Sequence, residues 1–169
     1  EEVGNITRSR HVGLLATPRT VNSHSYALEI EKIQPDITLT EMACPMWVPI
    51  VESGEAHGDG ADWFVNKYIS QLLDADPQID TLLLGCTHYP ILLPKIRKYA
   101  PEGIKVVPQG GIVADSLKDY LRRHPEIDSR CSRNGVTRFL TTENPDKFNT
   151  LASIFLDRKI SARRTDLCV

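Results

Sequence analysis

Short apolar runs alternate along this chain with segments in which apolar residues recur every three or four positions. The runs at 11–16, 37–43, 81–85 and 104–107 are typical of buried strands, because each is bounded by polar residues, glycine or proline. The segments between them have the spacing of helices. This alternation of strand and helix predicts an α/β protein with a mostly parallel sheet flanked by helices.

The clearest helical pattern begins at Asp59, which is expected to cap the helix, and continues through Leu73. An earlier helix is expected to begin after Thr20, which would cap it. This helix should end at Gln34-Pro35, because the residue that precedes a proline is disfavoured in the helical conformation. The predicted helices are 21–33, 59–73, 91–99, 112–121 and 145–156.

Three segments are expected to be irregular or extended. Residues 44–52 are apolar, rich in proline and end in Glu52, which is typical of a loop in a pocket wall. The sequence Pro-Gln-Gly-Gly at 108–111 indicates a turn and a domain boundary. The polar segment 126–135 predicts a loop. Strands are expected at 136–142 and, as an edge strand, at 159–167.

Charge and cysteine content exclude several classes of protein. A net charge of −2 and a pI near 6.2 argue against a nonspecific nucleic-acid binder. The sequence has no long apolar run and no signal peptide, so we expect a cytoplasmic protein without a membrane segment. The 4 cysteines are widely spaced, which indicates free thiols rather than a zinc site or disulfides. The sequence contains no glycine-rich phosphate loop, so it gives no support for nucleotide binding.

Cys86 is the first candidate for chemistry. It follows the predicted strand 81–85 directly, at the carboxyl end of a parallel strand, where open α/β sheets bind ligands. Thr87 and His88 come next, and Pro90 suits the first turn of a helix. A helix amino terminus and an imidazolium both favour the thiolate form of a cysteine. The alternative is that Cys86 and His88 only pack, as free cysteines commonly do.

Other polar residues lie near predicted strand ends. Thr17 and Thr20 follow the strand 11–16, either as turn formers and helix caps or as hydroxyls for a carboxylate. Glu52 is either a solvated acid at a helix start or a member of the same site.

Four motifs, in this order and at these separations, resemble glutamate racemases: HVGLLATPRT, ACPMWVPIVESGE, LLLGCTHYPIL and FLTTENPDKF. That family is one of the cofactor-independent amino-acid racemases, in which two α/β domains face each other across the active site. The resemblance implies interconversion of L- and D-glutamate for peptidoglycan synthesis, without pyridoxal or a metal. Glutamate is then the small-molecule partner. Whether the protein forms a homodimer is left open.

The resemblance also implies roles for individual residues. Cys86 matches one of two thiols that act on opposite faces of the glutamate α-carbon, and it removes the proton from L-glutamate. His88 matches the histidine that assists this thiol, and Glu52 matches the acid that orients the histidine, although Glu55 is near enough to exchange roles with it. The residues matched to substrate binding are Thr87, Thr17 and Thr20.

Two features of the family are absent from this sequence: the Ala-Cys-Asn-Thr segment with the first thiol, and the Asp-Ser-Gly segment of the first domain. The chain therefore resembles the carboxyl-terminal portion of a longer racemase. Residues 1–108 would be its second domain, and 109–169 the last piece of its first domain, with apolar surface exposed from Ile112 onward. We expect this chain alone to be inactive.

Two other functions stay open. Related racemases or isomerases act on aspartate or other small acids and also have a cysteine after a strand, although the His-Tyr-Pro continuation favours glutamate. A non-catalytic binding domain of the same fold would have an ordinary Cys86 thiol without a cleft beside it.

Overall fold

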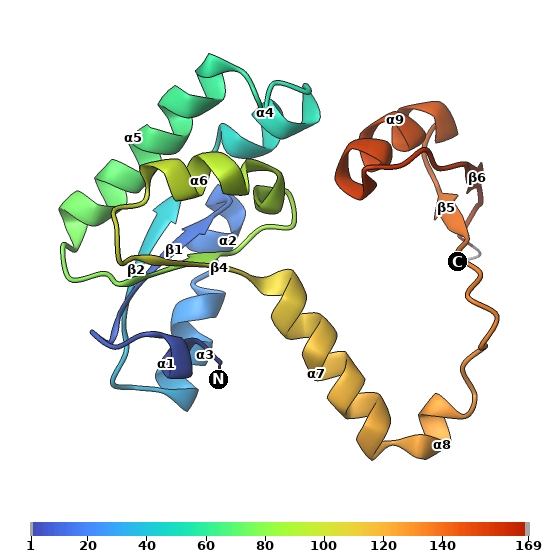
Figure 1. The fold of residues 1–169 in the computed structure, drawn as a ribbon, viewed down its shortest axis with the longest axis horizontal. Coiled ribbons are helices and arrows are strands. Elements are labelled where there is room, and N and C mark those ends of the chain that lie inside the picture. Colours follow the sequence, from blue (N-terminus) through green and yellow to red (C-terminus); the bar gives the residue numbers. More distant parts are fainter. Residues whose placement is uncertain (1, 168–169) are drawn as a thin grey trace. The chain divides into compact units, whose positions relative to one another are not determined.

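The computed structural model describes residues 2–167. These residues form two compact units, one that ends at Lys118 and one that begins at Asp119 (Figure 1). Each unit is described by itself below. The expected division into domains at residue 108 stays a prediction.

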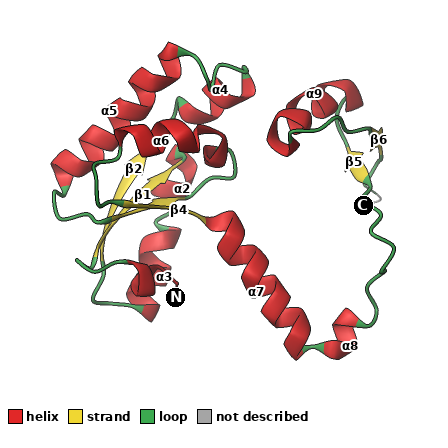
Figure 2. Cartoon of the chain, in the orientation of Figure 1, coloured by secondary structure: helices red, strands yellow, loops and turns green. Residues whose placement is uncertain are grey.

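A four-stranded parallel sheet forms the centre of the first unit, with strand order β2-β1-β3-β4. Figure 2 draws its strands in yellow. The sheet confirms the predicted fold class, and each strand begins and ends within one residue of its predicted bounds. The four strands are β1 (His11–Ala16), β2 (Thr38–Ala43), β3 (Thr81–Leu84) and β4 (Lys105–Pro108).

Helices cover both faces of this sheet (Figure 1). Val12, Leu14 and Leu83 point to one face and pack against apolar residues of α1 (Glu2–Ile6) and of the two helices after β1. Gly13 points to the other face, since side chains alternate along a strand. A Cβ atom at Gly13 would lie 2.7 Å from Leu72 Cδ2, so glycine allows the helix carrying Leu72 to pack closely. On that side lie α5 (Asp59–Ala75) and α6 (Leu93–Tyr99).

The predicted helix 21–33 is wrong in its bounds and its cap. The segment forms α2 (Pro18–Asn22) and α3 (Ser25–Ile33), with His24 between them at φ 49°. Thr17, not Thr20, is the cap, because Thr17 Oγ1 accepts from the Thr20 amide at 3.3 Å. Proline suits the first helical position, so the helix begins at residue 18 rather than at 21.

Three further predictions need correction. Gly58 occupies the N-cap position of α5, and Asp59 lies in the first turn. Residues 44–52 are not all loop, because Trp47–Glu52 form α4. The segment 108–111 is not a turn, because β4 continues directly into α7 (Gln109–Arg123).

The second unit begins within α7 and has a small parallel pair of strands, β5 (Phe139–Thr141) and β6 (Ala162–Arg164). Between them α9 (Pro145–Leu156) has its predicted bounds, and Asn144 Oδ1 caps it. The strand predicted at 136–142 is shorter in the structure, and part of the segment predicted as loop is a short helix, α8 (Pro125–Asp128).

Apolar side chains are exposed on this part of the chain, as expected from Ile112 onward. Ile112 itself packs against the core of the first unit, but Val113 and Leu117 on α7 are 61% and 56% exposed. The other large apolar residues that are exposed here are Tyr120, Ile127, Val136, Leu140, Ile154, Leu156 and Leu167.

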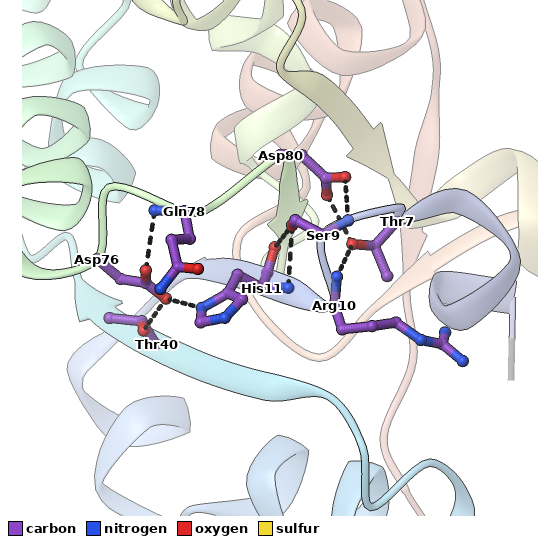
Figure 3. Close-up of polar contacts among 8 residues, drawn as sticks. All are labelled: Thr7, Ser9, Arg10, His11, Thr40, Asp76, Gln78 and Asp80. Carbon is purple, nitrogen blue, oxygen red and sulfur yellow. Dashed lines mark hydrogen bonds and ion pairs between the residues drawn. The ribbon is translucent and has the colours of Figure 1, made fainter.

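Two aspartates link chain segments near the amino-terminal ends of the parallel strands (Figure 3). Asp80 accepts hydrogen bonds from Thr7 Oγ1 at 2.6 Å and from the Ser9 amide at 2.8 Å. Asp76 lies 2.8 Å from His11 Nδ1 and 3.3 Å from Thr40 Oγ1. The segment before β1, β2 and the turn before β3 are thereby joined.

Partial burial raises the pKa of Asp80, but donors from Thr7, Ser9, Arg8 and Thr81 outweigh it and hold the pKa well below its usual range. A carboxyl group whose pKa is lowered by folding stabilises the folded state above its unfolded pKa, about 3.9. This contribution is lost as the pH falls below that value.

We therefore expect Asp80→Asn to lower the free energy of unfolding by about 2 kcal/mol at pH 7, because the amide is a weaker acceptor for these donors. The difference from the wild type should shrink between pH 5 and pH 3. Urea denaturation across this range measures it. Asp74→Asn, at an exposed position of α5, is the control and should change little. A difference that does not depend on pH would contradict the prediction.

Candidate active site

Cys86 lies at the carboxyl end of β3, as predicted. The backbone amide of Gly85 still donates to Leu15 O at 2.9 Å, so the residue before the thiol is held by the sheet. A Cβ atom at Gly85 would lie 2.9 Å from Leu14 Cδ1 and 3.1 Å from Ala16 Cβ. Glycine at this position therefore lets the strand end lie close to β1 before the chain turns.

The chain turns directly after the thiol. The Tyr89 amide donates to Cys86 O at 3.2 Å, and a short 3₁₀ helix, η1 (Tyr89–Leu92), follows and leads into α6. The helix start expected near Pro90 is therefore present, as a 3₁₀ turn. Tyr89 is fully buried, whereas Cys86 and His88 are partly exposed. The turn thus places the thiol and the imidazole at the surface, above a buried aromatic ring.

His88 lies between the thiol and a carboxylate. Its Nδ1 is 3.8 Å from Cys86 Sγ, and its Nε2 is 3.1 Å from Glu52 Oε1. If Glu52 accepts the Nε2 proton, the neutral ring presents the Nδ1 lone pair to the thiol. When the ring is protonated, it donates from both nitrogens, and its positive charge stabilises a thiolate. The arrangement can therefore hold the thiol in either protonation state.

Glu52 reaches His88 because of an aromatic contact. Trp47, on the same helix α4, is fully buried, and its ring lies edge-on to Tyr89 at 4.7 Å between centroids. Trp47 Nε1 also donates to Phe64 O of α5 at 3.4 Å. Packing between the residue after His88 and the helix that ends in Glu52 therefore brings the acid and the histidine together.

Glu52, rather than Glu55, is the acid that contacts His88 in this structure. Glu55 Oε2 lies near Gly58, where an added Cβ atom would approach it to 3.2 Å. The carboxylate of Glu55 is thus directed toward the loop before α5.

A cavity of about 270 Å³ lies beside the thiol. A free cleft at Cys86 is what a catalytic thiol requires and what an inert, packed cysteine lacks. Thr87 belongs to its lining and is itself exposed. The described lining residues are Tyr26, Leu84, Gly85, Cys86, Thr87, Pro90, Gln109 and Gly110.

Thr17 and Thr20 contact each other at the carboxyl end of the neighbouring strand. Their hydroxyl oxygens are 2.9 Å apart, and Thr17 caps α2. Neither residue belongs to the described lining of the cavity beside Cys86. The structure therefore shows Thr17 as a helix cap, and the predicted contact of Thr17 and Thr20 with a carboxylate stays a prediction.

A second cysteine lies close to this site but differs from Cys86. Cys44 is 1% exposed, and burial raises the pKa of its thiol far above the usual value, with a smaller contribution from Cys86. Burial likewise raises the pKa of Tyr89, whose hydroxyl donates to Cys44 O. Both groups therefore stay neutral near pH 7. Among the described residues, no group of three or more histidine, cysteine or acidic side chains could hold a metal ion.

Comparisons with known proteins show what this chain is similar to. No family model matches the chain. Over 164 residues the chain is 37% identical to the glutamate racemase of Streptococcus pyogenes serotype M5 (strain Manfredo), and this alignment covers 95% of the chain and 60% of that protein. This chain is homologous to the glutamate racemases.

Solved structures support the relationship. A glutamate racemase isoform from Bacillus anthracis is 25% identical, with a TM-score of 0.84 over 98% of this chain and 61% of that one. The glutamate racemase from Francisella tularensis, solved in complex with D-glutamate, is 29% identical, with a TM-score of 0.79 over 95% of this chain and 58% of that one. The chain spans about 60% of the length of the curated relatives it matches.

Sequence reasoning missed two residues beside the thiol of this racemase homologue. In the sequence Tyr26 lies within the predicted helix 21–33 and Gln109 within the predicted turn 108–111, and neither position points to a site. Both line the cavity and contact each other. Gln109 directly follows β4, so the rule that ligands bind at the carboxyl ends of parallel strands points to it as well as to Cys86.

The contact between Glu52 and His88 can be tested with a matched pair of variants. We expect Glu52→Gln to slow alkylation of Cys86 by iodoacetamide at pH 7 by roughly threefold, because an amide stabilises the imidazolium less and so supports less thiolate. Glu55→Gln is the control and should react like the wild type. Mass spectrometry of the peptide that contains Cys86 measures the rate. Equal effects of the two substitutions would show that only net charge matters.

Proposed function

We propose that the protein to which this chain belongs interconverts L- and D-glutamate by proton transfer, for use in peptidoglycan synthesis, with Cys86 as one of two acid/base thiols. The observation that carries the proposal is that His88 contacts both the Cys86 thiol and the Glu52 carboxylate beside a cavity, in a homologue of glutamate racemases. The D-glutamate bound by the Francisella tularensis enzyme supports an amino acid as the ligand.

The chemistry begins with removal of the α-proton. The Cys86 thiolate takes this proton from L-glutamate, so an S–H bond forms as the C–H bond breaks. The electron pair stays on the α-carbon next to the carboxylate, where it needs hydrogen-bond donors directed at the developing charge. A second thiol then gives a proton from the opposite face, and the configuration is inverted. A thiolate can take a proton and a thiol can give one, so the same pair of cysteines serves in both directions of this reaction.

His88 would act through the thiol in this mechanism. It accepts or returns the proton of Cys86 between turnovers, and Glu52 keeps its ring oriented. Thr87 lines the cavity next to the thiol, which is consistent with its predicted role in substrate binding. Thr17 and Thr20 remain proposed contacts for the substrate carboxylates, from the end of the neighbouring strand.

Cys44 does not suit the role of the second thiol. It is buried, its raised pKa makes it too weak an acid to give up its proton, and it lies outside the described lining of the cavity. The second thiol would then come from a part of the parent protein beyond this chain, as the resemblance to the family implies. The chain would then provide one face of the reaction.

In the full-length parent protein, we expect Cys86→Ala to abolish racemisation of glutamate, a loss of at least about 1000-fold, because no other group can take the proton on this face. Circular dichroism of the glutamate solution measures the conversion. Cys131→Ala, at an exposed cysteine, is the control and should keep full activity. If Cys86→Ala is as active as the wild type, the proposed function is wrong. Activity with aspartate but not glutamate would favour the related small-acid racemases.

The 169-residue chain alone should not racemise glutamate. One thiol exchanges a proton on one face of the α-carbon and cannot invert it. Incubation of the purified chain with L-glutamate, followed by chiral chromatography, tests this. Accumulation of D-glutamate would contradict the two-thiol mechanism, provided that a Cys86→Ala preparation made in parallel shows none.

A further inference from the structure

Gln109 joins two elements that border the cavity beside Cys86. It is the first residue of α7, and its side-chain nitrogen Nε2 lies 2.6 Å from Tyr26 Oη and 3.0 Å from Leu84 O. Tyr26 belongs to α3, and Leu84 is the last residue of β3, two positions before the thiol. Gln109, Tyr26, Leu84 and Cys86 all line the same cavity.

The bond to Leu84 extends the hydrogen-bond ladder between β3 and β4. In a parallel pair the donors of one strand come from every second residue. Lys105 N donates to Asp80 O at 2.8 Å, and the same spacing leads to a donor at position 109 for Leu84 O. Residue 109 already begins a helix, and here its side-chain amide donates to that carbonyl. The last peptide of β3 before Gly85 is held in this way.

Both hydrogens of the Gln109 amide have acceptors in this arrangement. An amide nitrogen carries two N–H groups in one plane. One is directed at the backbone of β3 and the other at the Tyr26 hydroxyl, so a shift of either acceptor strains the other bond. The amide therefore fixes the end of β3 relative to α3 on the cavity side of the sheet.

We propose that Gln109 is a positioning residue for the Cys86 thiol. The proposal rests on the proposed function, in which Cys86 transfers a proton and so needs a fixed geometry. Only Gly85 separates the carbonyl that Gln109 holds from Cys86. Loss of the amide would let the strand end move and lengthen the 3.8 Å contact between Cys86 Sγ and His88 Nδ1. The thiolate would then lose part of its stabilisation.

The test is the pH dependence of Cys86 alkylation in Gln109→Leu, which keeps the size of the side chain and removes both donors. In the 169-residue chain, iodoacetamide labelling of the Cys86 peptide is followed by mass spectrometry from pH 5 to pH 10. We expect the pH of half-maximal rate to rise by about 0.5, which is roughly a threefold slower reaction at low pH. The titratable neighbours His88, Glu52, Cys44 and Tyr89 are the same in both proteins.

Gln71→Leu is the matched control, since Gln71 is exposed on α5 and outside the cavity lining. A second variant, Gln109→Glu, has nearly the wild-type shape, but its carboxylate cannot donate to Leu84 O. Its added negative charge should raise the half-maximal pH further than Gln109→Leu does. Far-ultraviolet circular dichroism shows whether each variant is folded.

The proposal is overturned if a folded Gln109 variant has the half-maximal pH of the wild type. A rate that changes equally at every pH also overturns it, because Gln109 would then control only access to the thiol. These measurements contain no glutamate, so they do not depend on racemase activity. A parent protein with Cys86→Ala that still racemises glutamate would refute the proposed function and leave this result as a statement about the thiol alone.

Discussion

The parallel pairing of β1 with β3 is the interaction on which the site depends. Both strands are buried on both faces, and Gly85 at the end of β3 lies so close to β1 that no larger residue fits without movement. Because the strands are parallel, their carboxyl ends share one edge of the sheet, where the residues after each strand gather. Gly85, the residue before Cys86, is bonded to β1 through the Leu15 carbonyl, so the thiol directly follows a residue that the sheet holds.

The residues at the two ends of the parallel strands have different roles. At the amino-terminal edge, Asp76 and Asp80 accept hydrogen bonds from neighbouring segments and stabilise the fold, and their side chains are largely satisfied by protein donors (Figure 3). At the carboxyl ends of the strands, Cys86 lies beside a cavity, and His88 contacts both the thiol and Glu52. The aspartates that stabilise the fold and the thiol proposed for the chemistry lie at opposite ends of the strands. A substitution at one end can therefore be studied with little disturbance of the other end.

Aromatic packing gives the thiol its acid partner. The edge-on contact of Trp47 with Tyr89 fixes α4 against the turn after Cys86, and Glu52 then reaches His88. A similar principle holds on the other side of the thiol, where Gln109 ties the strand end to α3. In both cases a residue from a distant part of the sequence positions a group that is not its neighbour along the chain.

Hydrophobic periodicity by itself determined the four strands of the larger sheet, the α/β class and the place of Cys86, because buried parallel strands have continuous apolar runs whose ends are visible in the sequence. The strands expected at 136–142 and 159–167 are much shorter in the structure. Local turn chemistry was harder: the sequence pattern assigned caps to Thr20 and Asp59, whereas Thr17 and Gly58 occupy those positions. Only the tertiary structure decided between Glu52 and Glu55, and only it placed Tyr26 and Gln109 beside the thiol. Those contacts depend on how helices pack across the sheet, a distance in space that local spacing along the chain does not encode.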